Sequence, residues 1–540
     1  MSNARPDIVL ILNDDMGYSD LGCYGGEVHT PTLDRLAADG LRFSQFYNTA
    51  RCSPSRASLL TGLHPHQTGI GILTYDSGPE GYAGNLNQQC VTIAEVLRSG
   101  GYRTCMSGKW HVSSNLKTPT DSWPMQRGFD RFYGTIIGAG SFYDPNTLTR
   151  GNDNVEHEAH ADGFFYTDAI SDQAAAYIRE HHAEHPERPL FQYVAYTAPH
   201  WPLHAHDEDI AKYKGRFDAG WDQLREERLE RLVADGLLAA HWKLSGRDPS
   251  QPPWTAAEHK GWLLRCMEVY AAQIDRMDQG IARIVQALKD TGRFDNTLII
   301  FLADNGACAE DIPQGVSIEE LVDKLMIARA TTRRGEPVHI GNDVDRMPGP
   351  ENTYQSYGTA WANLSNTPFR LYKHWIHEGG ISTPLIFHWP LGITQRGQIR
   401  HTPGYLPDVM ATLLDVTGVP YPAQHQGRAV LPLEGHSLKT AFERDAIEAR
   451  PPMFWEHEGN AAVRIGRWKL VRRHPHDWEL YDLDADRTEL NDLAAQQPER
   501  VREMAAQYAA WARRCGVLDR DQVVALMRSQ GVTRAFWEEE

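Results

Sequence analysis

Two stretches of the chain place carboxylate and amide oxygens directly after an apolar run that is typical of a buried β-strand. These are Asp14-Asp15, after Ile8–Leu12, and Asp304-Asn305, after Leu298–Ala303. In open α/β sheets, sites collect beyond the carboxyl ends of the strands. Each pair alone is also typical of a turn or a helix cap. Together they offer hard oxygen ligands without thiolate or imidazole, which favours a calcium or magnesium site over a zinc site.

A third stretch is Cys52-Ser53-Pro54-Ser55-Arg56. Pro54 is typical of a helix start, so we expect Cys52 at a helix N-terminus, where the helix dipole favours anions, and Arg56 in the first turn. A lone cysteine is more often a small buried hydrophobe. A thiolate nucleophile would need a base beside it, and none is adjacent in the sequence, so a cysteine hydrolase gains little support.

Cationic and imidazole side chains follow two further strand-like runs. Lys109 and His111 follow Tyr102–Ser107, and His200 follows Leu190–Ala195. Taken singly, each is more often a solvated lysine or a structural histidine. Four strand ends that converge on cations, carboxylates and imidazoles instead favour a catalytic site.

Several of these segments resemble the type I sulfatases. Cys52–Gly62 matches C-x-P-S-R-x-x-x-L-T-G, the family's signature. Further segments match in the same order: Asp14-Asp15, Gly108-Lys109-Trp110-His111, Ala198-Pro199-His200-Trp201-Pro202, Asp304-Asn305-Gly306, Lys373 before Gly379-Gly380, and Trp478–Leu483 with Glu489 and Asn491. The resemblance spans almost the whole chain and is closest to bacterial arylsulfatases.

The resemblance implies two groups that the sequence does not contain. A formylglycine-generating enzyme would oxidise Cys52 to Cα-formylglycine. One hydroxyl of the hydrated aldehyde would attack sulfur, and deprotonation of the other would expel sulfate. One Ca²⁺ per chain would be held by Asp14, Asp15, Asp304, Asn305 and an oxygen of residue 52.

The resemblance also implies roles for the other residues. Arg56, Lys109 and Lys373 would stabilise charge on the sulfuryl oxygens. His200, with Lys373, would act as the acid at the leaving oxygen, and His111 would take the proton that drives elimination. Asp304 would in addition be able to accept the proton of the attacking hydroxyl.

We therefore expect a sulfuric ester hydrolase of the arylsulfatase type, which cleaves small-molecule or carbohydrate sulfate monoesters to an alcohol or phenol and sulfate. One alternative is a phosphodiesterase or phosphonate monoester hydrolase that uses the same aldehyde. Another is a noncatalytic calcium-binding homologue. A two-zinc phosphatase is disfavoured because it would need further histidine or aspartate ligands.

Strand-like runs alternate with amphipathic stretches, which predicts an α/β protein. The resemblance implies an alkaline phosphatase-like fold, with helices on both faces of a large mixed sheet and a small C-terminal α+β domain. We place the catalytic domain at 1–435, with irregular insertions at about 204–260 and 311–370, and the C-terminal domain at 436–540. The expected helices are Thr32–Ala38, Thr92–Ser99, Asp168–His182, Trp262–Lys289, Leu406–Val416 and Pro498–Arg514, and the further expected strands are Pro384–His388, Met453–Glu456, Ala462–Val471 and Glu479–Leu483.

Composition excludes several classes of protein. The chain of 540 residues has a formal net charge of −17, which disfavours nucleic-acid binding. Its longest clean apolar run, Leu298–Ala303, is far shorter than the ~20 residues of a transmembrane helix, so no membrane contact is expected. Seven widely spaced cysteines without a C-x-x-C pair make disulfides or structural zinc improbable. We expect a cytoplasmic protein without a signal peptide, or a periplasmic one if a leader has been removed.

Overall fold

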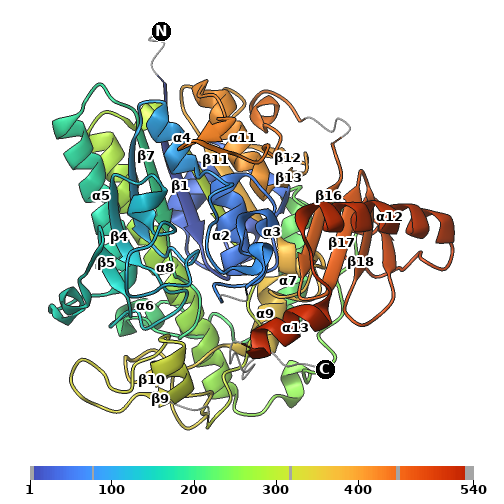
Figure 1. Ribbon diagram of the computed structural model, residues 1–540. Helices are drawn as coiled ribbons and strands as arrows, with labels where there is room; N and C mark the ends of the chain where they lie inside the picture. Colours follow the sequence, from blue (N-terminus) through green and yellow to red (C-terminus); the bar gives the residue numbers. More distant parts are fainter. Residues whose placement is uncertain (1–4, 76–77, 316–318, 446–449, 530–540) are drawn as a thin grey trace.

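A large mixed sheet forms the centre of the molecule, and helices cover both of its faces (Figure 1). The computed structural model describes residues 5–75, 78–315, 319–445 and 450–529. Eleven strands of the described residues belong to this sheet. The predicted α/β class and the large mixed sheet are therefore confirmed.

Four parallel strands occupy the middle of the sheet, in the order β8-β1-β7-β3. They are β1 (Asp7–Asn13), β3 (Arg103–Gly108), β7 (Leu190–Ala195) and β8 (Thr297–Ala303). Because neighbouring strands run in the same direction, their last residues lie side by side. We call this side of the sheet the carboxyl edge. All four strands coincide with strand-like runs identified in the sequence.

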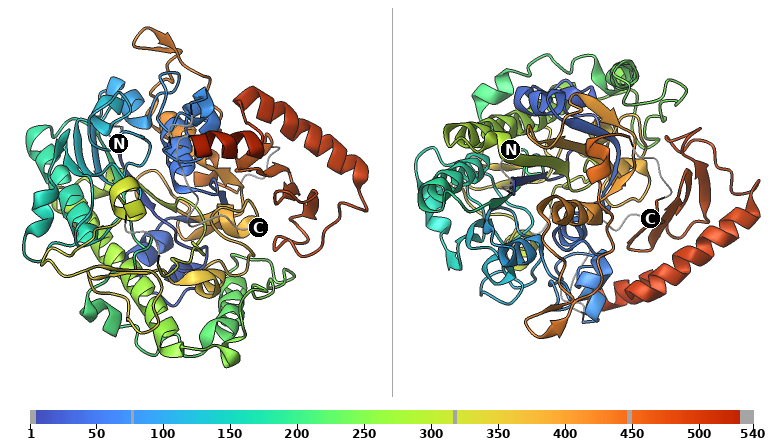
Figure 2. Two further views of the ribbon diagram at one scale, coloured as in Figure 1. Left: turned by 60° about the horizontal axis from the view of Figure 1, so that its bottom comes forward. Right: turned by 90° about the horizontal axis from the view of Figure 1, so that it is seen from above.

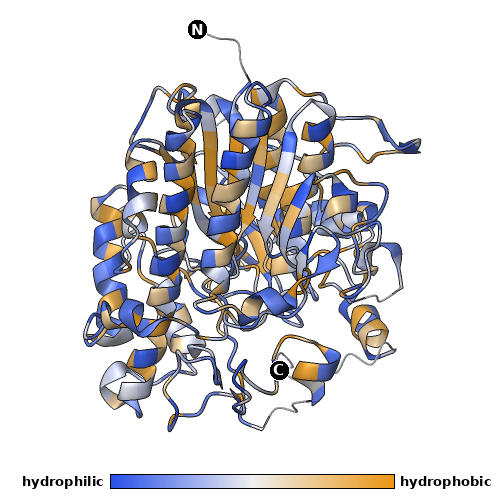
Figure 3. Ribbon diagram, turned by 90° about the vertical axis from the view of Figure 1, so that its left-hand side faces the viewer, coloured by the Kyte–Doolittle hydropathy of each residue, from blue (hydrophilic) through white to orange (hydrophobic). Residues whose placement is uncertain are grey.

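Strand β1 shows why these runs are apolar throughout. Val9 and Ile11 pack into the core on one face of the sheet, and Ile8, Leu10 and Leu12 pack into the core on the other. A strand buried on both faces cannot alternate with polar residues, and Figure 3 shows the hydrophobic strands between amphipathic helices. The helices are α1 (Pro31–Ala38), α5 (Tyr166–Glu184) and α8 (Lys260–Asp290) on the first face and α2 (Cys52–Thr61), α4 (Ile93–Ser99) and α11 (Leu406–Thr417) on the second.

The flanks of the sheet are less regular than its centre. The predicted strand at residues 384–388 is β11 (Ser382–His388), which pairs antiparallel with β8 and with β2 (Leu41–Tyr47). Strand β2 was not predicted, because Arg42 and Gln45 interrupt its apolar pattern. The remaining strands are β12 (Gln398–Arg400) and β13 (Gly404–Tyr405) beside β2, and β4 (Arg131–Thr135), β5 (Leu148–Arg150) and β6 (Asp153–Asn154) beyond β3.

A four-stranded antiparallel sheet with a packed helix lies beside the large sheet (Figures 1 and 2). The predicted C-terminal α+β unit is thus confirmed. The prediction of a single strand at Ala462–Val471 is wrong. The chain turns at Gly466, whose φ is 57°, and forms two paired strands instead. The elements are β16 (Met453–His457), β17 (Asn460–Ile465), β18 (Trp468–Arg472), β19 (Glu479–Asp482), α12 (Pro498–Cys515) and α13 (Arg520–Ser529).

The two insertions differ in structure. The first contains α6 (Asp207–Ala211) and α7 (Gly220–Ala234), as its partly helical sequence predicts. The second is mostly irregular, but it includes α9 (Gly358–Ser365), which the prediction missed. The short elements are α3 (Pro65–Thr68), α10 (Glu378–Ile381), β9 (His339–Ile340), β10 (Thr353–Tyr354), β14 (Gln424–His425) and β15 (Arg428–Ala429). Among the described residues, no helix has the length and apolarity needed to cross a membrane.

Buried charges join the C-terminal sheet to α10, the short helix that leads into β11 of the large sheet. Lys469 on β18 lies 2.9 Å from Glu378 and 2.8 Å from Glu489, and Arg487 lies 3.0 Å from Glu378. Burial alone would raise the pKa of Glu378, but Lys469 and Arg487 lower it to about 2. Because this pKa is depressed in the folded protein, the charge of Glu378 contributes stability above about pH 4.5, and that contribution is lost as the pH falls towards 2.

We expect Lys469→Met to lower the free energy of unfolding by about 3–5 kcal/mol, since removal of one buried partner leaves uncompensated charge behind. Denaturant unfolding at neutral pH measures this change. Lys439→Met is the matched control, because its pair with Asp415 is half-exposed and should contribute less than about 1 kcal/mol. Equal losses in the two variants would contradict the predicted role of burial.

Candidate functional site

The carboxyl edge brings the predicted oxygen ligands together. Asp14 and Asp15 follow β1, and Asp304 and Asn305 follow the neighbouring strand β8. All four side chains are buried. One carboxylate oxygen from each aspartate lies within 4.8 Å of the others. The sequence alone could not show this proximity, because the pairs are about 290 residues apart along the chain.

The oxygen atoms of this group suit a cation. Burial and the nearby charge of Asp14 raise the pKa of Asp304 well above its usual value. Asn305 donates to Oδ1 of Asp15 at 2.7 Å, while its own Oδ1 and Oδ1 of Asp14 accept no hydrogen bond from the described residues. Buried oxygens without donors are costly in a protein interior. A hard divalent ion would satisfy both atoms and relieve the repulsion between the carboxylates.

Three buried cations surround the aspartates. Arg56 lies 3.1 Å from Asp304 and 3.4 Å from Asp14, whose other oxygen lies 2.5 Å from Lys109 Nζ. Lys373 contacts Asp15 at 2.8 Å. Burial would raise the pKa of Asp14, but Lys109, His200 and Arg56 hold it well below its usual value. The predicted cations therefore lie in one group with the predicted ligands.

Cys52 is the first residue of helix α2 and lies beside this group. The helix begins two residues before Pro54, so Arg56 is its fifth residue. Arg56 therefore lies past the first turn, and the prediction that it lies within the first turn is wrong. Ser55 donates to the backbone carbonyl of Asp304 at 2.5 Å, which holds the start of the helix against the end of β8. Burial raises the pKa of the Cys52 thiol despite Lys109 and Lys373. An unmodified thiol is therefore not activated here.

Both predicted histidines are neutral near pH 7. His200 Nε2 lies 3.2 Å from Lys373 Nζ, and its Nδ1 lies 2.6 Å from the carbonyl of Trp201. Since a carbonyl only accepts, Nδ1 carries the proton and the Nε2 lone pair faces Lys373. Burial lowers the pKa of His200 to about 4, against the charge of Asp15. Burial, Lys109 and Arg56 also lower the pKa of His111.

Cys52, His111, His200 and Lys373 line one cavity of about 90 Å³. The lining of this cavity is largely apolar. The insertion at 311–370 supplies part of that lining. The apolar and aromatic residues of the lining are Leu73, Tyr75, Ile137, Ala139, Trp201, Leu325 and Ile327.

A wider cavity of about 590 Å³ also contains Lys373 in its wall. Tyr372 and Trp375 line this second space and not the first. Tyr372 donates to Asp248 at 2.9 Å. Of Trp201, Tyr372 and Trp375, which stand close to His200 or Lys373 in the sequence, only Trp201 lines the cavity that contains Cys52.

Two residues of the site, Arg51 and Glu310, have no recognisable signal in the sequence. Arg51 donates to Glu310 at 2.6 Å, and Trp201 donates to the same carboxylate at 3.0 Å. Glu310 also lies 3.8 Å from Lys373. Burial would raise the pKa of Glu310, but Arg51 and Lys373 lower it. Only its position on the loop after Asn305 would have suggested a role, and that loop has no periodic pattern.

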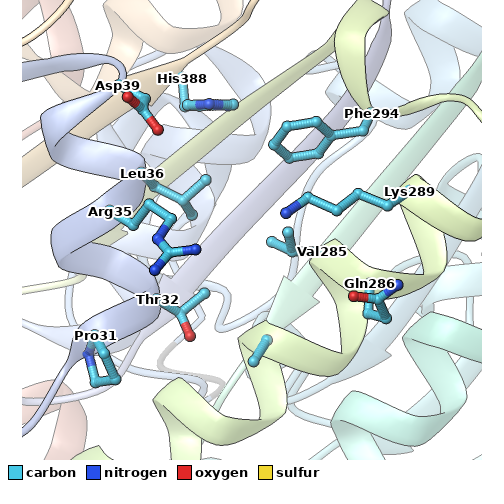
Figure 4. Close-up of a pocket in the computed structure, with 11 residues that line it drawn as sticks. Pro31, Thr32, Arg35, Leu36, Asp39, Val285, Gln286, Lys289, Phe294 and His388 are labelled. Atoms are coloured by element: carbon cyan, nitrogen blue, oxygen red, sulfur yellow. The ribbon is translucent and has the colours of Figure 1, made fainter.

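Another hollow, of about 310 Å³, lies between α1 and α8 (Figure 4). His388 and Lys289 line it. Since His388 pairs with Ile299 near the start of β8, this hollow lies at the opposite end of the strand from Asp304. It contains none of the predicted site residues.

Comparison with known proteins identifies the family. A sequence model of the Sulfatase family matches residues 6–419. The chain belongs to the sulfatase family. A second model, N-sulphoglucosamine sulphohydrolase, C-terminal, matches residues 369–510. The predicted family and enzyme class are confirmed, and the protein is a sulfatase.

Relatives cover most of the sulfatase chain. It is 34% identical to an arylsulfatase of Klebsiella aerogenes, over 80% of this chain and 91% of the relative. It is 31% identical to an uncharacterized sulfatase of Schizosaccharomyces pombe, over 95% and 94% of the two chains. The crystal structure of Ps i-CgsB has the same fold, with a TM-score of 0.67 and 23% identity over 98% of both chains.

We expect Asp304→Asn to weaken calcium binding by more than about 100-fold, since loss of even an outer-shell partner costs about 10–100-fold. The calcium-free protein should lose little stability, because the substitution also removes repulsion from Asp14. Titration calorimetry and unfolding temperatures with and without Ca²⁺ measure the two effects. Asp162→Asn, on the surface, is the control. Unchanged calcium affinity in Asp304→Asn would exclude this residue as a ligand.

Proposed function

We propose that this sulfatase hydrolyses sulfate monoesters with an apolar, preferably aryl, leaving group, using Ca²⁺ and a formylglycine made from Cys52. The observation that carries the proposal is that Cys52 lines a largely apolar cavity and lies next to buried cations. The identity to an arylsulfatase supports the same substrate class. Apart from the predicted site residues, only Arg51 and Thr74 add polar side chains to the described lining of this cavity, so the hydroxyls of a carbohydrate would find few partners there.

The charges of the site suit an anionic substrate. Three aspartates and three cations are close to balanced within the carboxyl edge. When bound, Ca²⁺ would add positive charge against the sulfate oxygens, and the hydrated formylglycine would supply the nucleophile. Arg56 orients Asp14 and Asp304, while Lys109 and Lys373 place ammonium groups near residue 52. An enzyme of net charge −17 thereby attracts an anion locally.

Lys373 and His200 are placed to handle the proton of the leaving group. The unprotonated Nε2 of His200 faces the ammonium of Lys373. Lys373 is therefore the proton donor of the pair, and His200 Nε2 is the acceptor. An alkoxide or phenoxide that leaves at this point would draw a proton from the pair. His111 contributes a second neutral imidazole in the same cavity and could accept a proton from residue 52.

Mass spectrometry of the tryptic peptide Cys52–Arg56 tests the modification. In protein made with a formylglycine-generating enzyme, we expect a mass about 18 Da below that of the cysteine form, because sulfur is exchanged for oxygen with loss of two hydrogens. A known sulfatase expressed in the same cells is the control. An intact Cys52 beside a converted control would refute the proposed nucleophile.

We expect His200→Ala to slow esters of weakly acidic alcohols by about 100–10,000-fold, and nitrophenyl sulfate much less, because a good leaving group needs little protonation. Steady-state kcat/KM over a series of leaving groups measures the difference. His182→Ala, on the exposed face of α5, is the control. An equal loss for every leaving group would remove His200 from the acid role.

The same kinetic assay separates the proposed reaction from its alternative. Phosphate diesters and phosphonate monoesters with the same aryl group are compared with the aryl sulfate. We expect the highest kcat/KM for the sulfate. A higher value for either phosphorus ester would replace the proposed activity by phosphodiester or phosphonate hydrolysis.

A further inference from the structure

A second cluster of metal-ligating side chains lies outside the aspartate group. It consists of His374, His457 and Glu458, each of which offers one ligand atom within 4.8 Å of the other two. The two imidazole rings pack edge-to-face with their centroids 5.2 Å apart, and the carboxylate of Glu458 lies close to both. One of its carboxylate oxygens is 3.9 Å from Nδ1 of His374, and the other is 4.0 Å from Nε2 of His457.

The three residues come from two parts of the fold that meet near Cys52. His374 follows Lys373, and its backbone amide donates to the carbonyl of Ala50 at 2.7 Å. His457 and Glu458 lie at the hairpin between β16 and β17 of the C-terminal sheet. The cluster therefore spans the junction between the loop of Lys373 and His374 and the C-terminal sheet.

We propose that His374, His457 and Glu458 bind a divalent transition-metal ion, of which Zn²⁺ is the representative, at a site separate from the aspartate group. Two imidazoles and one carboxylate are a recurrent zinc ligand set in which the fourth position stays open. The aspartate group has only oxygen ligands and selects a harder ion. The two sets of ligands thus differ in the metal that they prefer.

The distances are compatible with closure around an ion. Ligands about 2.1 Å from a tetrahedral zinc ion lie about 3.4 Å from one another. The separations of 3.9 Å and 4.0 Å between Glu458 and the two imidazoles would shorten by about 0.5 Å, and since no two of the three ligand atoms are more than 4.8 Å apart, closure requires side-chain movements of about 1 Å. Asn460 Nδ2 lies 3.4 Å from Nε2 of His374, on the far side of the ring, so Nδ1 is turned towards Glu458.

An ion can reach the cluster from solvent. The side chain of His374 is 21% exposed, whereas that of Glu458 is 5% exposed. His374 also lines the 590 Å³ cavity together with Arg51 and Lys373. Arg51 lines the same cavity; it pairs with Glu310 at 2.6 Å and also interacts electrostatically with Glu458, so a bound metal would share this carboxylate with it. A bound metal would tie the loop of Lys373 to the C-terminal sheet.

The test uses the full-length protein saturated with Ca²⁺, so that the oxygen site is filled, and dialysed against Zn²⁺ at increasing concentration. Elemental analysis is expected to give one zinc per chain. Glu458→Gln, His374→Ala and His457→Ala should each weaken zinc binding by more than about 100-fold, whereas His182→Ala should not change it. Co²⁺ in place of zinc should give visible d–d absorption in the wild-type protein and lose it in the variants.

Unfolding temperatures distinguish loss of the site from loss of the fold. Without zinc, the variants should unfold near the wild-type temperature, and only the wild-type protein and His182→Ala should be stabilised by zinc. If His457→Ala does not fold, the more exposed His374 carries the test. Wild-type protein without bound zinc, or variants that bind it unchanged, would overturn the proposal. A change of KM for aryl sulfate in variants that still bind zinc would instead make these residues substrate contacts.

Discussion

The repulsion between three buried carboxylates is the constraint on which the site depends. Asp14, Asp15 and Asp304 would not remain close together in a dry interior without positive charge between and around them. Arg56, Lys109 and Lys373 supply part of that charge from three other segments of the chain. All three cations also interact electrostatically with Cys52, so the same groups that balance the carboxylates determine the charge around this residue.

This balance requires a rigid frame. Parallel strands buried on both faces fix the positions of their last residues, and β1 and β8 remain in register as far as Asn13 and Ala303. Helix α2 is then anchored by a hydrogen bond from Ser55 to the backbone of Asp304. Cys52 therefore occupies a position set by the sheet and not by its own loop. Such anchoring limits movement of Cys52 relative to the cations.

The C-terminal sheet completes the surroundings of the site. Lys469 and Arg487 reach Glu378 on α10, in the segment that follows Lys373 and His374. The buried ion pairs hold this segment at Glu378, and the hairpin of His457 and Glu458 contacts it at His374. The second sheet is thus a structural partner of the loop of Lys373, although none of the predicted catalytic residues belongs to that sheet.

The sequence by itself determined the central strands, the covering helices and the types of residue at the strand ends. These follow from local patterns: apolar runs such as Leu298–Ala303 are buried on both faces, and a helix starts beside Pro54. Strand β2 was not predicted because Arg42 and Gln45 interrupt its apolar pattern. The single strand predicted at Ala462–Val471 is divided into two by a turn at Gly466. Local pattern loses its meaning where pairing with distant strands decides the conformation.

Only the tertiary structure decided which residues meet. Glu310 joins Arg51, Trp201 and Lys373 through contacts that span from 63 to 259 residues of sequence, and no local spacing encodes them. The apolar wall likewise combines side chains from separate loops, among them Leu73, Ile137 and Ile327. The physical reason is that side-chain chemistry is written in the sequence, whereas distance, burial and therefore charge interaction arise only when the chain folds.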